Sequence, residues 1–302
     1  MITFFTTTKA FNGKNSVNQL NAIDSWLAAD PNSEIVIFGN AKGSDLLPNT
    51  SRIKIIENIK TNENGVPVLN FMFSQVSMIA HNQWCCYINA DILISSPLID
   101  ILKIIKQQEH KKVLIVGQRI DVDVNERLAF ADGWVGTFEE KYKDSFKLHS
   151  PSGIDYFLFP KGQYTETNMP PMLVGRPGWD LWMIGNAVKS GYKAIDLSRS
   201  YKIYHQNHDY NHKNKNVHIR AFEDEYNYQF LNEDEKYNYT LYACNYKFEK
   251  GKVKKNYSRN NLTEWIKINA TLHPEGSIKR KFYKLSWYIN SIIRTKLKCV
   301  VF

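Results

Sequence analysis

The sequence has little that would place it in a membrane or outside the cell. It contains no apolar run of about 18 residues, which a membrane-spanning helix requires. Its N-terminus enters the apolar segment Ile2–Thr6 without the basic region and cleavage site of a secretory signal. The four cysteines, Cys85, Cys86, Cys244 and Cys299, lack metal-ligand spacing, so buried reduced thiols are expected. We therefore expect a cytoplasmic protein.

Several common nucleotide and hydrolase motifs are also missing. No Gly-x-Gly-x-x-Gly follows the first apolar segment, and no lysine-bearing P-loop is present. No Gly-x-Ser-x-Gly nucleophile elbow occurs. These absences argue against dinucleotide binding, P-loop chemistry and α/β-hydrolase chemistry.

What is present is an alternation of short apolar segments with helical patterns. Hydrophobic residues make up 43% and charged residues 23%, which is ordinary for a globular protein with a sizeable core. A helix is expected from Ser16, with Gln19 completing a capping box, and another is opened by Pro97. Strands are expected at Thr3–Thr6, Glu34–Phe38, Ile53–Ile56, Trp84–Ile88 and Val113–Val116. The pattern predicts an α/β fold, a mostly parallel sheet with helices on both faces.

Polar motifs follow three of these strands, where ligands of parallel sheets bind. They are Thr6–Thr8, Gly39–Asn40 and Asn89–Asp91. A carboxylate at a strand end, such as Asp91, can hold Mg²⁺ or Mn²⁺, which prefer oxygen ligands. An Asp in this place can also be only a turn former or a helix cap.

Three histidines fall within eight residues in the run His205–His212, together with Asp209. One of them could complete a metal site with Asp91. The alternative is a polar surface loop. The spacing matches no closed structural zinc site, and no cysteine accompanies it.

Two further runs carry candidate acids. In Gly175–Asp180, Asp180 falls at a helix start, where it could cap the helix or act as general base, and Arg176 could contact diphosphate oxygens. In Gly153–Pro160, Asp155 and the aromatic residues could line an acceptor pocket. The second run could equally be a core strand with one polar end.

Taken in order, these motifs resemble a family of GT-A-like nucleotide-diphospho-sugar transferases found in plants and bacteria. The resemblance spans roughly residues 1 to 212. It is carried by Ser25–Leu27, Glu34–Asn40, Glu63–Pro67, Tyr87–Ile92, Gly117–Arg119, Asp155–Pro160, Gly175–Asp180 and His205–Tyr210.

The resemblance implies a Rossmann-like sheet that binds a nucleotide sugar, with a divalent cation, Mn²⁺ or Mg²⁺. Asp91 would match the last carboxylate of an Asp-x-Asp metal motif, whose first position here is Asn89, and His205 or His208 would contact metal or phosphate. The other implied positions are Thr6, Thr7 and Lys9 against the nucleotide, Asn40 or Glu57 near the base or ribose, and Asp180 on the acceptor side.

The resulting hypothesis is a glycosyltransferase that moves a sugar from a nucleotide-diphosphate donor to a hydroxyl of a glycan or lipid-linked acceptor. Asp180 would take the acceptor proton and the anomeric centre would be inverted, although a retaining course is not excluded by sequence. Asp155 is the alternative base.

The charge of the chain is concentrated at its C-terminus. Residues 275–302 carry seven Lys and Arg against Glu275, a net +6 of the whole chain's +9. We divide the chain into residues 1–215, the catalytic domain, 216–270, an appended segment, and 271–302, a basic amphipathic helix. This helix could lie on an anionic membrane surface or dock on the catalytic body with a solvated basic face.

Two other classes of function compete with the transferase. A sugar nucleotidyltransferase would share the sheet but needs a Gly-rich basic loop after the first strand, which Thr6–Lys9 is not. A nucleic-acid-binding module would use the basic tail and show steep salt dependence. Outside the tail the charge is close to neutral, so no nucleic acid partner is expected.

Overall fold

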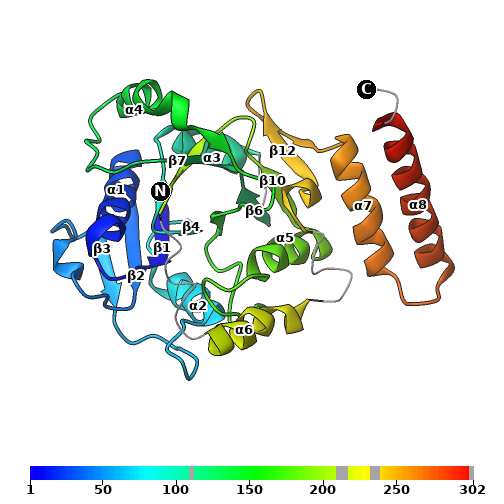
Figure 1. Ribbon diagram of the computed structural model, residues 1–302, viewed down its shortest axis with the longest axis horizontal. Coiled ribbons are helices and arrows are strands. Elements are labelled where there is room, and N and C mark those ends of the chain that lie inside the picture. The colour runs from blue at the N-terminus through cyan, green and yellow to red at the C-terminus, as the bar shows by residue number, and fades with distance from the viewer. Residues whose placement is uncertain (109–111, 209–216, 232–238, 299–302) are drawn as a thin grey trace.

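The computed structural model describes residues 1–108, 112–208, 217–231 and 239–298. Within these residues, nine strands form one mixed sheet in which most neighbouring strands run parallel (Figure 1). In order across the sheet they are β13 (Lys252–Lys255), β12 (Tyr246–Glu249), β10 (Lys193–Asp196), β6 (Val113–Val116), β9 (Tyr156–Pro160), β4 (Trp84–Ile88), β1 (Ile2–Thr7), β2 (Glu34–Phe38) and β3 (Ile53–Ile56). The predicted α/β class is confirmed by this topology.

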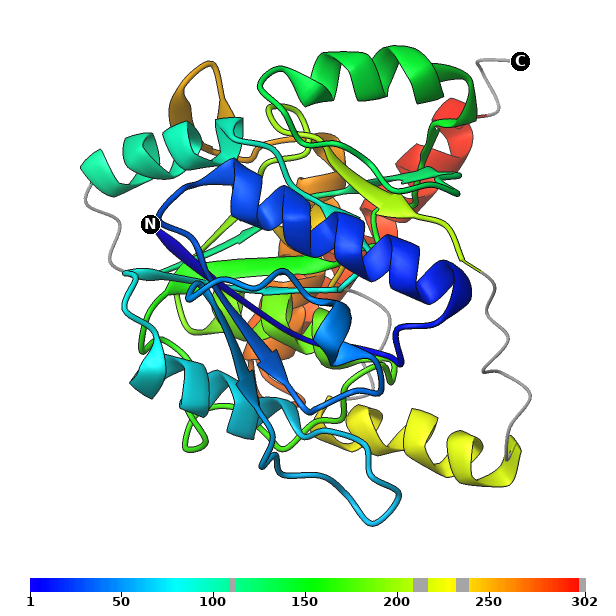
Figure 2. The same ribbon diagram turned by 90° about the vertical axis from the view of Figure 1, so that its left-hand side faces the viewer.

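Alternate residues of each strand point to opposite sides of the sheet. Both faces are apolar, and helices cover both of them. Phe4 packs with Trp26 of α1 (Gly13–Ala29), and α3 (Pro97–Gln107) shares that core. Phe5 packs with Phe73 of α2 (Leu69–Ile79), and α5 (Trp179–Lys189) shares the other core. Figure 2 shows α1 and α2 on opposite sides of the sheet.

Two strands depart from the parallel arrangement: the edge strand β13, which is antiparallel to β12, and β9 in the middle of the sheet. Strand β9 runs antiparallel to both of its neighbours, β4 and β6. The first residue of β9 therefore lies at the edge where the parallel strands end. Because of this reversal, Asp155, which precedes β9, comes next to Asn89, which follows β4: the Asn89 backbone N–H donates to the Asp155 carbonyl at 3.0 Å.

The structure also contains a second, smaller sheet, which the sequence pattern did not predict. Among the described residues it has the order β5 (Ile92–Leu93), β11 (Ile203–Gln206), β7 (Arg119–Val122) and β8 (Lys147–Leu148). Helix α4 (Trp134–Tyr142) supplies Phe138, which packs on Tyr204 of β11 in a separate apolar cluster. This sheet brings residues near 91, 121 and 205 together.

The predicted capping box at Ser16 is wrong. Helix α1 begins three residues earlier, at Gly13, and its N-cap Asn12 makes no side-chain cap. Gln19 is used elsewhere: its amide accepts from the Lys9 backbone N–H at 2.6 Å and donates to the Lys9 carbonyl at 3.0 Å. The hydrogen bonds of Gln19 to the Lys9 backbone thus take the place of the predicted local cap.

The C-terminal part contains α6 (Val217–Tyr226), α7 (Arg259–Leu272) and α8 (Ile278–Lys298), which confirms a C-terminal helical segment. The predicted boundary at residues 215 and 216 lies outside the described residues, and the one at 271 falls in the last turn of α7. The domain division stays a prediction. Of the helices described, none is long and apolar enough to cross a bilayer.

The cysteines within the described residues, Cys85, Cys86 and Cys244, are free and buried, as expected. Burial raises the pKa of each of these thiols. Cys299 lies outside the described residues.

Candidate metal and nucleotide site

A cavity of about 500 Å³ lies at the edge of the large sheet where β1 and β4 end. Its walls come from the segments after these two strands, from β11, and from the loops around residues 65 and 175. The predicted site residues that line it are Thr6, Thr7, Lys9, Asn89, Asp91, Asp155, Arg176, His205 and His208. Two of the three strand-end motifs, Thr6–Thr8 and Asn89–Asp91, therefore line the cavity, and Gly39–Asn40 does not.

The loop after β1 is held in place against this cavity. Gln19 of α1 binds both the N–H and the carbonyl of Lys9, so the backbone of Thr6–Lys9 is fixed along one wall. Its three hydroxyls and one ammonium group can meet an anionic or polyhydroxylated ligand. The segment contains no glycine to cradle a phosphate closely.

Three side chains from distant positions converge at the cavity wall: Asp91, His205 and His208. Asp91 Oδ2 lies 3.1 Å from His208 Nε2 and 3.6 Å from His205 Nε2. One ligand atom from each of the three lies within 4.8 Å of the others. The pairing of β11 with β5 positions them, since His205 lies opposite Ile92 and the Gln206 N–H donates to the Asp91 carbonyl at 3.0 Å.

The donor atoms of this cluster fit a divalent cation. Asp91 Oδ1 is buried and accepts no hydrogen bond from any residue the structure describes. A buried carboxylate oxygen without a partner is costly unless a cation binds it. One carboxylate and two imidazoles form a mixed oxygen and nitrogen donor set. The second half of the histidine run, Asp209–His212, lies outside the described residues.

The charges in the cluster are strongly coupled. Burial alone would raise the pKa of Asp91, but His205 and His208 outweigh it and hold this pKa well below its usual range. Burial would lower the pKa of His205, but the Asp91 carboxylate outweighs it and raises that pKa. The Asp91 carboxylate therefore stays ionised, as a cation ligand must.

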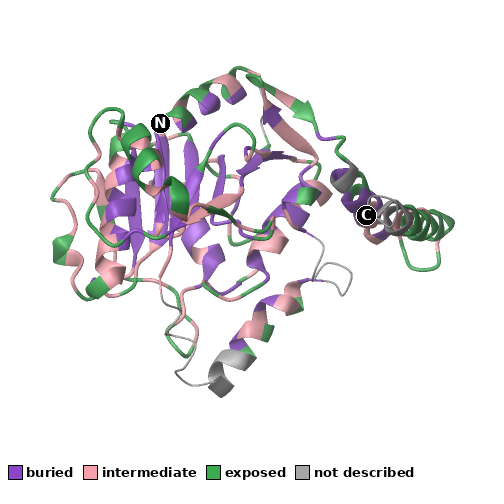
Figure 3. Cartoon of the chain, turned by 45° about the horizontal axis from the view of Figure 1, so that its top comes forward, coloured by how far each residue is buried: buried purple, intermediate pink, exposed green. Residues whose placement is uncertain are grey.

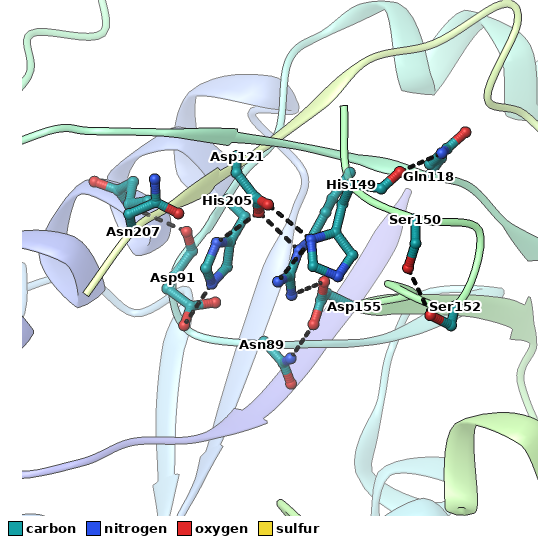
Figure 4. A network of polar contacts seen from close by, with 12 residues as sticks. Asn89, Asp91, Gln118, Asp121, His149, Ser150, Ser152, Asp155, His205 and Asn207 are labelled. Atoms are coloured by element: carbon teal, nitrogen blue, oxygen red, sulfur yellow. Dashed lines mark hydrogen bonds and ion pairs between the residues drawn. The ribbon is translucent and has the colours of Figure 1, made fainter. Parts of the chain in front are cut away.

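Behind the cluster lies a second layer that the sequence did not predict. His205 Nδ1 lies 3.1 Å from Asp121 Oδ1, so Asp121 contacts the ring nitrogen that faces away from Asp91. Asp121 is in turn contacted by Arg119 Nε at 2.9 Å and by His149 Nδ1 at 2.7 Å. Figure 4 shows His205 between Asp91 and Asp121. The sequence offered one signal for this second layer. Arg119 and Asp121 are two residues apart, so they lie on the same face of a strand.

Asp155, one of the two predicted bases, lines the cavity with both carboxylate oxygens engaged. Asn89 Nδ2 donates to Oδ1 at 2.6 Å, and Arg119 Nη1 donates to Oδ2 at 2.6 Å. An aspartate in place of Asn89 would set two carboxylates against each other, so the amide at the first motif position matches its surroundings. The aromatic residues Tyr156–Phe159 are buried in the core. The interpretation of this run as a core strand with one polar end is thus confirmed.

Asp180, the other predicted base, is in the first turn of α5. It does not line the cavity, but its neighbour Trp179 does, where its ring packs against Tyr87 and Phe157. Burial raises the pKa of Asp180 to about 6, and the charge of Asp155 acts in the same direction, while backbone N–H groups at the start of α5 act against it. A carboxyl with this pKa can exchange a proton near neutral pH.

Arg176 lines the cavity, but its guanidinium is anchored on α6. Its Nε and Nη2 donate to Glu223 Oε2 at 2.9 and 2.5 Å. Glu223 Oε1 accepts from the side-chain amides of Asn62 and Asn64 at 2.8 and 2.9 Å. This buried carboxylate therefore joins two walls of the cavity, the loop before Pro67 and the loop after Val174.

Asn40 and Glu57 are at the same sheet edge, after β2 and β3, but outside the cavity lining. They bind one another, with Asn40 Nδ2 donating to Glu57 Oε1 at 2.9 Å. Their predicted place near the base or ribose stays a prediction.

Neither protein-family models nor the sequences of curated proteins give a match to this chain. Solved structures that resemble it include S. aureus TarS, residues 1–349, with 13% identity and a TM-score of 0.43 over 90% of this chain and 79% of that one. Another is a proposed nucleotide-diphospho-sugar transferase from Desulfovibrio desulfuricans G20, with 9% identity and a TM-score of 0.41 over 76% of this chain and 97% of that one. At these scores the likeness carries no argument about activity.

Proposed function

We propose that this chain is a metal-dependent glycosyltransferase of the GT-A type. It would move a sugar from a nucleotide-diphosphate donor to a hydroxyl of a glycan or lipid-linked acceptor, with inversion. The observation that carries the proposal is the convergence of Asp91, His205 and His208 in the same cavity as the fixed loop Thr6–Lys9. That arrangement puts a cation site next to hydroxyl and ammonium groups that suit a nucleotide diphosphate.

Asp91, His205 and His208 would hold the cation, and the buried, unpartnered Asp91 Oδ1 is a fourth donor atom at the same place. The bound cation would neutralise charge on the departing diphosphate. The two imidazoles favour Mn²⁺ over Mg²⁺, and the same donor set also suits Zn²⁺. Asp121 would keep His205 Nε2 directed at the metal by holding the other ring nitrogen.

The remaining lining residues divide into a donor side and an acceptor side. Lys9 and the hydroxyls of Thr6 and Thr7 would contact the nucleotide and its phosphates. Arg176 would shape the wall, since its Nε and Nη2 are committed to Glu223 and only Nη1 faces a weak acceptor, the Gly175 carbonyl at 3.3 Å. Trp179 and Tyr87 would form an apolar part of the cavity wall.

We propose Asp180, next to the cavity-lining Trp179, as the general base, with the cavity-lining Asp155 as the alternative. A pKa of about 6 lets Asp180 accept a proton at neutral pH, whereas both oxygens of Asp155 already accept strong hydrogen bonds. Asp180 would take the proton of the acceptor hydroxyl while that oxygen attacks the anomeric carbon, and the bond to the diphosphate oxygen would break.

The first test is a thermal-shift screen of nucleoside diphosphates and nucleotide sugars, with Mn²⁺, Mg²⁺ or Zn²⁺ and with EDTA. A ligand present at about 100 times its Kd stabilises the folded state by about 2.7 kcal/mol. We expect one nucleoside to raise the melting temperature only with metal, and Asp91→Ala to remove this rise. Asp100→Ala is the matched control, because Asp100 is exposed on α3, away from the cavity.

The same screen separates the competing classes. A rise with nucleoside triphosphate and with nucleotide sugar, but not with nucleoside diphosphate, together with release of pyrophosphate from the triphosphate and a sugar phosphate, would favour a nucleotidyltransferase. Absence of any nucleotide effect on folded protein, with every metal, would overturn the proposal.

A further inference from the structure

The C-terminal helices form a hairpin beside the catalytic body. Helix α7 packs against the short turn Leu241–Ala243 of the body on one side and against α8 on the other. Figure 1 shows α8 as the outermost element of the hairpin. Helix α8 is therefore joined to the body through α7.

The face of α8 that meets α7 is polar and aromatic. Tyr283 packs edge-on against Trp265 and stacks on His273, in both cases with ring centroids 5.7 Å apart. Asn290 Nδ2 donates to Thr263 Oγ1 at 2.9 Å. These contacts fix the rotation of α8 about its axis.

With this rotation, the apolar stripe of α8 is left in solvent. Its six residues are 40 to 87% exposed: Ile278, Phe282, Leu285, Ile289, Ile292 and Ile293. At about 100° per residue they occupy an arc of roughly 100°, centred about 120° round the helix from Tyr283 and Asn290. Figure 3 shows this helix largely in the colour of exposed residues, whereas the strands are buried. The stripe is thus not used for docking on the body.

The charges beside the stripe indicate what covers it. Residues 278–298 contain no Asp or Glu, and the exposed Lys279 and Lys281 lie on either side of the stripe on α8. Tyr288, an amphipathic ring that suits a membrane–water interface, is also exposed, about 90° round the helix from the stripe centre. A continuous exposed apolar stripe marks an interaction surface, and cationic flanks favour an anionic one.

We propose that the α8 stripe is a docking surface for an anionic lipid bilayer, with the helix lying in the plane of the headgroups. A second copy of the chain is a poorer occupant, because pairing two stripes would bring together two segments of net charge +6. Nucleic acid has no apolar surface to match six aliphatic and aromatic side chains. Because basic residues are distributed along α8, the helix would lie on the bilayer surface and not cross it. This proposal does not depend on the proposed activity.

The test is co-sedimentation of the full chain with vesicles of phosphatidylcholine alone or with added phosphatidylglycerol. We expect binding to the anionic vesicles only, weakened by salt. The double variant Phe282→Glu/Ile289→Glu should lose at least tenfold in binding. Met78→Glu is the matched control, since Met78 on α2 is 63% exposed and Phe282 is 62% exposed. Replacing Lys279, Lys281 and Lys284 by Gln should weaken binding about fivefold per residue, or about 1 kcal/mol each.

Melting temperature and Mn²⁺ binding, measured on every variant, keep this test separate from the proposed activity. Equal binding by the double variant, or no binding of folded wild-type chain to anionic vesicles, would overturn the proposal. Light scattering identifies the other occupant: a multimer that the double variant converts to monomer, without vesicle binding, would assign the stripe to a second copy.

Discussion

Helices α3 and α8 both carry an apolar stripe at helical spacing, but the stripe of α3 is buried and the stripe of α8 is exposed. The stripe of α3, Leu98, Ile101, Leu102 and Ile105, is at most 7% exposed and packs under the sheet. The stripe of α8 is at least 40% exposed. The difference teaches that amphipathic spacing defines an apolar face but not its partner, which depends on what the rest of the chain places beside it.

The largest expected effect lies in the chemistry of the body. Asp180→Asn should lower kcat by about 10²–10⁴-fold, because the general base is lost. In the wild type, activity should fall below pH about 6, where this carboxyl takes up a proton. Leu285→Ala in α8 should leave turnover of a soluble substrate unchanged.

Melting temperature distinguishes this role from a structural one. Because the pKa of Asp180 is raised by folding, its ionisation destabilises the native state as the pH rises from about 4 to above 6. Asn cannot ionise, so Asp180→Asn should melt no lower than wild type at pH 7. Retained activity in Asp180→Asn and its loss in a folded Asp155→Asn would transfer the role of base to Asp155.

The second prediction compares the two stripes directly. Leu102→Ala in α3 should lower the free energy of unfolding by about 2–5 kcal/mol, because it opens a cavity in the core. Leu285→Ala, at a site 58% exposed, should change it by less than about 0.5 kcal/mol. Urea denaturation measures both. Equal losses in the two variants would mean that the α8 stripe is covered in solution.

A smaller effect is expected behind the metal cluster. Asp121→Asn should weaken Mn²⁺ binding by about 10–100-fold, because His205 loses the partner that orients its ring. Electron paramagnetic resonance of free Mn²⁺ gives the affinity without an activity assay. Asp100→Asn is the control. Unchanged Mn²⁺ affinity in Asp121→Asn would show that Asp121 does not support the metal site.

The smallest effect is at the contact that sets the rotation of α8. Asn290→Ala removes the hydrogen bond to Thr263 and should lower the free energy of opening the α7–α8 contact by about 0.5–1.5 kcal/mol. Hydrogen exchange of the α8 amides reports this opening. Ser286→Ala, whose hydroxyl donates to the Phe282 carbonyl in its own helix, is the control. Protection equal to that of wild type would show that the aromatic contacts of Tyr283 suffice.

The strands and the strand-end motifs were readable from sequence because they depend on local pattern. The apolar runs at residues 34–38, 53–56, 84–88 and 113–116 are strands with the expected bounds. Asp91 was identifiable because a polar residue directly after a buried strand must reach the carboxyl edge of the sheet. Sequence did not identify Asp121, His149 or Glu223, the partner of Arg176. The contacts His149–Asp121, Arg176–Glu223 and His205–Asp121 each join residues that are 28 or more positions apart.

By itself, the sequence determined the α/β class, the edge of the sheet where ligands would bind, the candidate acids and histidines, and the amphipathic basic helix. These follow from periodicity and composition, which act over a few residues. Only the tertiary structure decided that β9 runs antiparallel and brings Asp155 to Asn89, that a second sheet carries His205 to Asp91, and that the apolar stripe of α8 faces solvent. Each of these depends on which distant segments pack together, and local pattern leaves that choice open because many pairings satisfy the same periodicity.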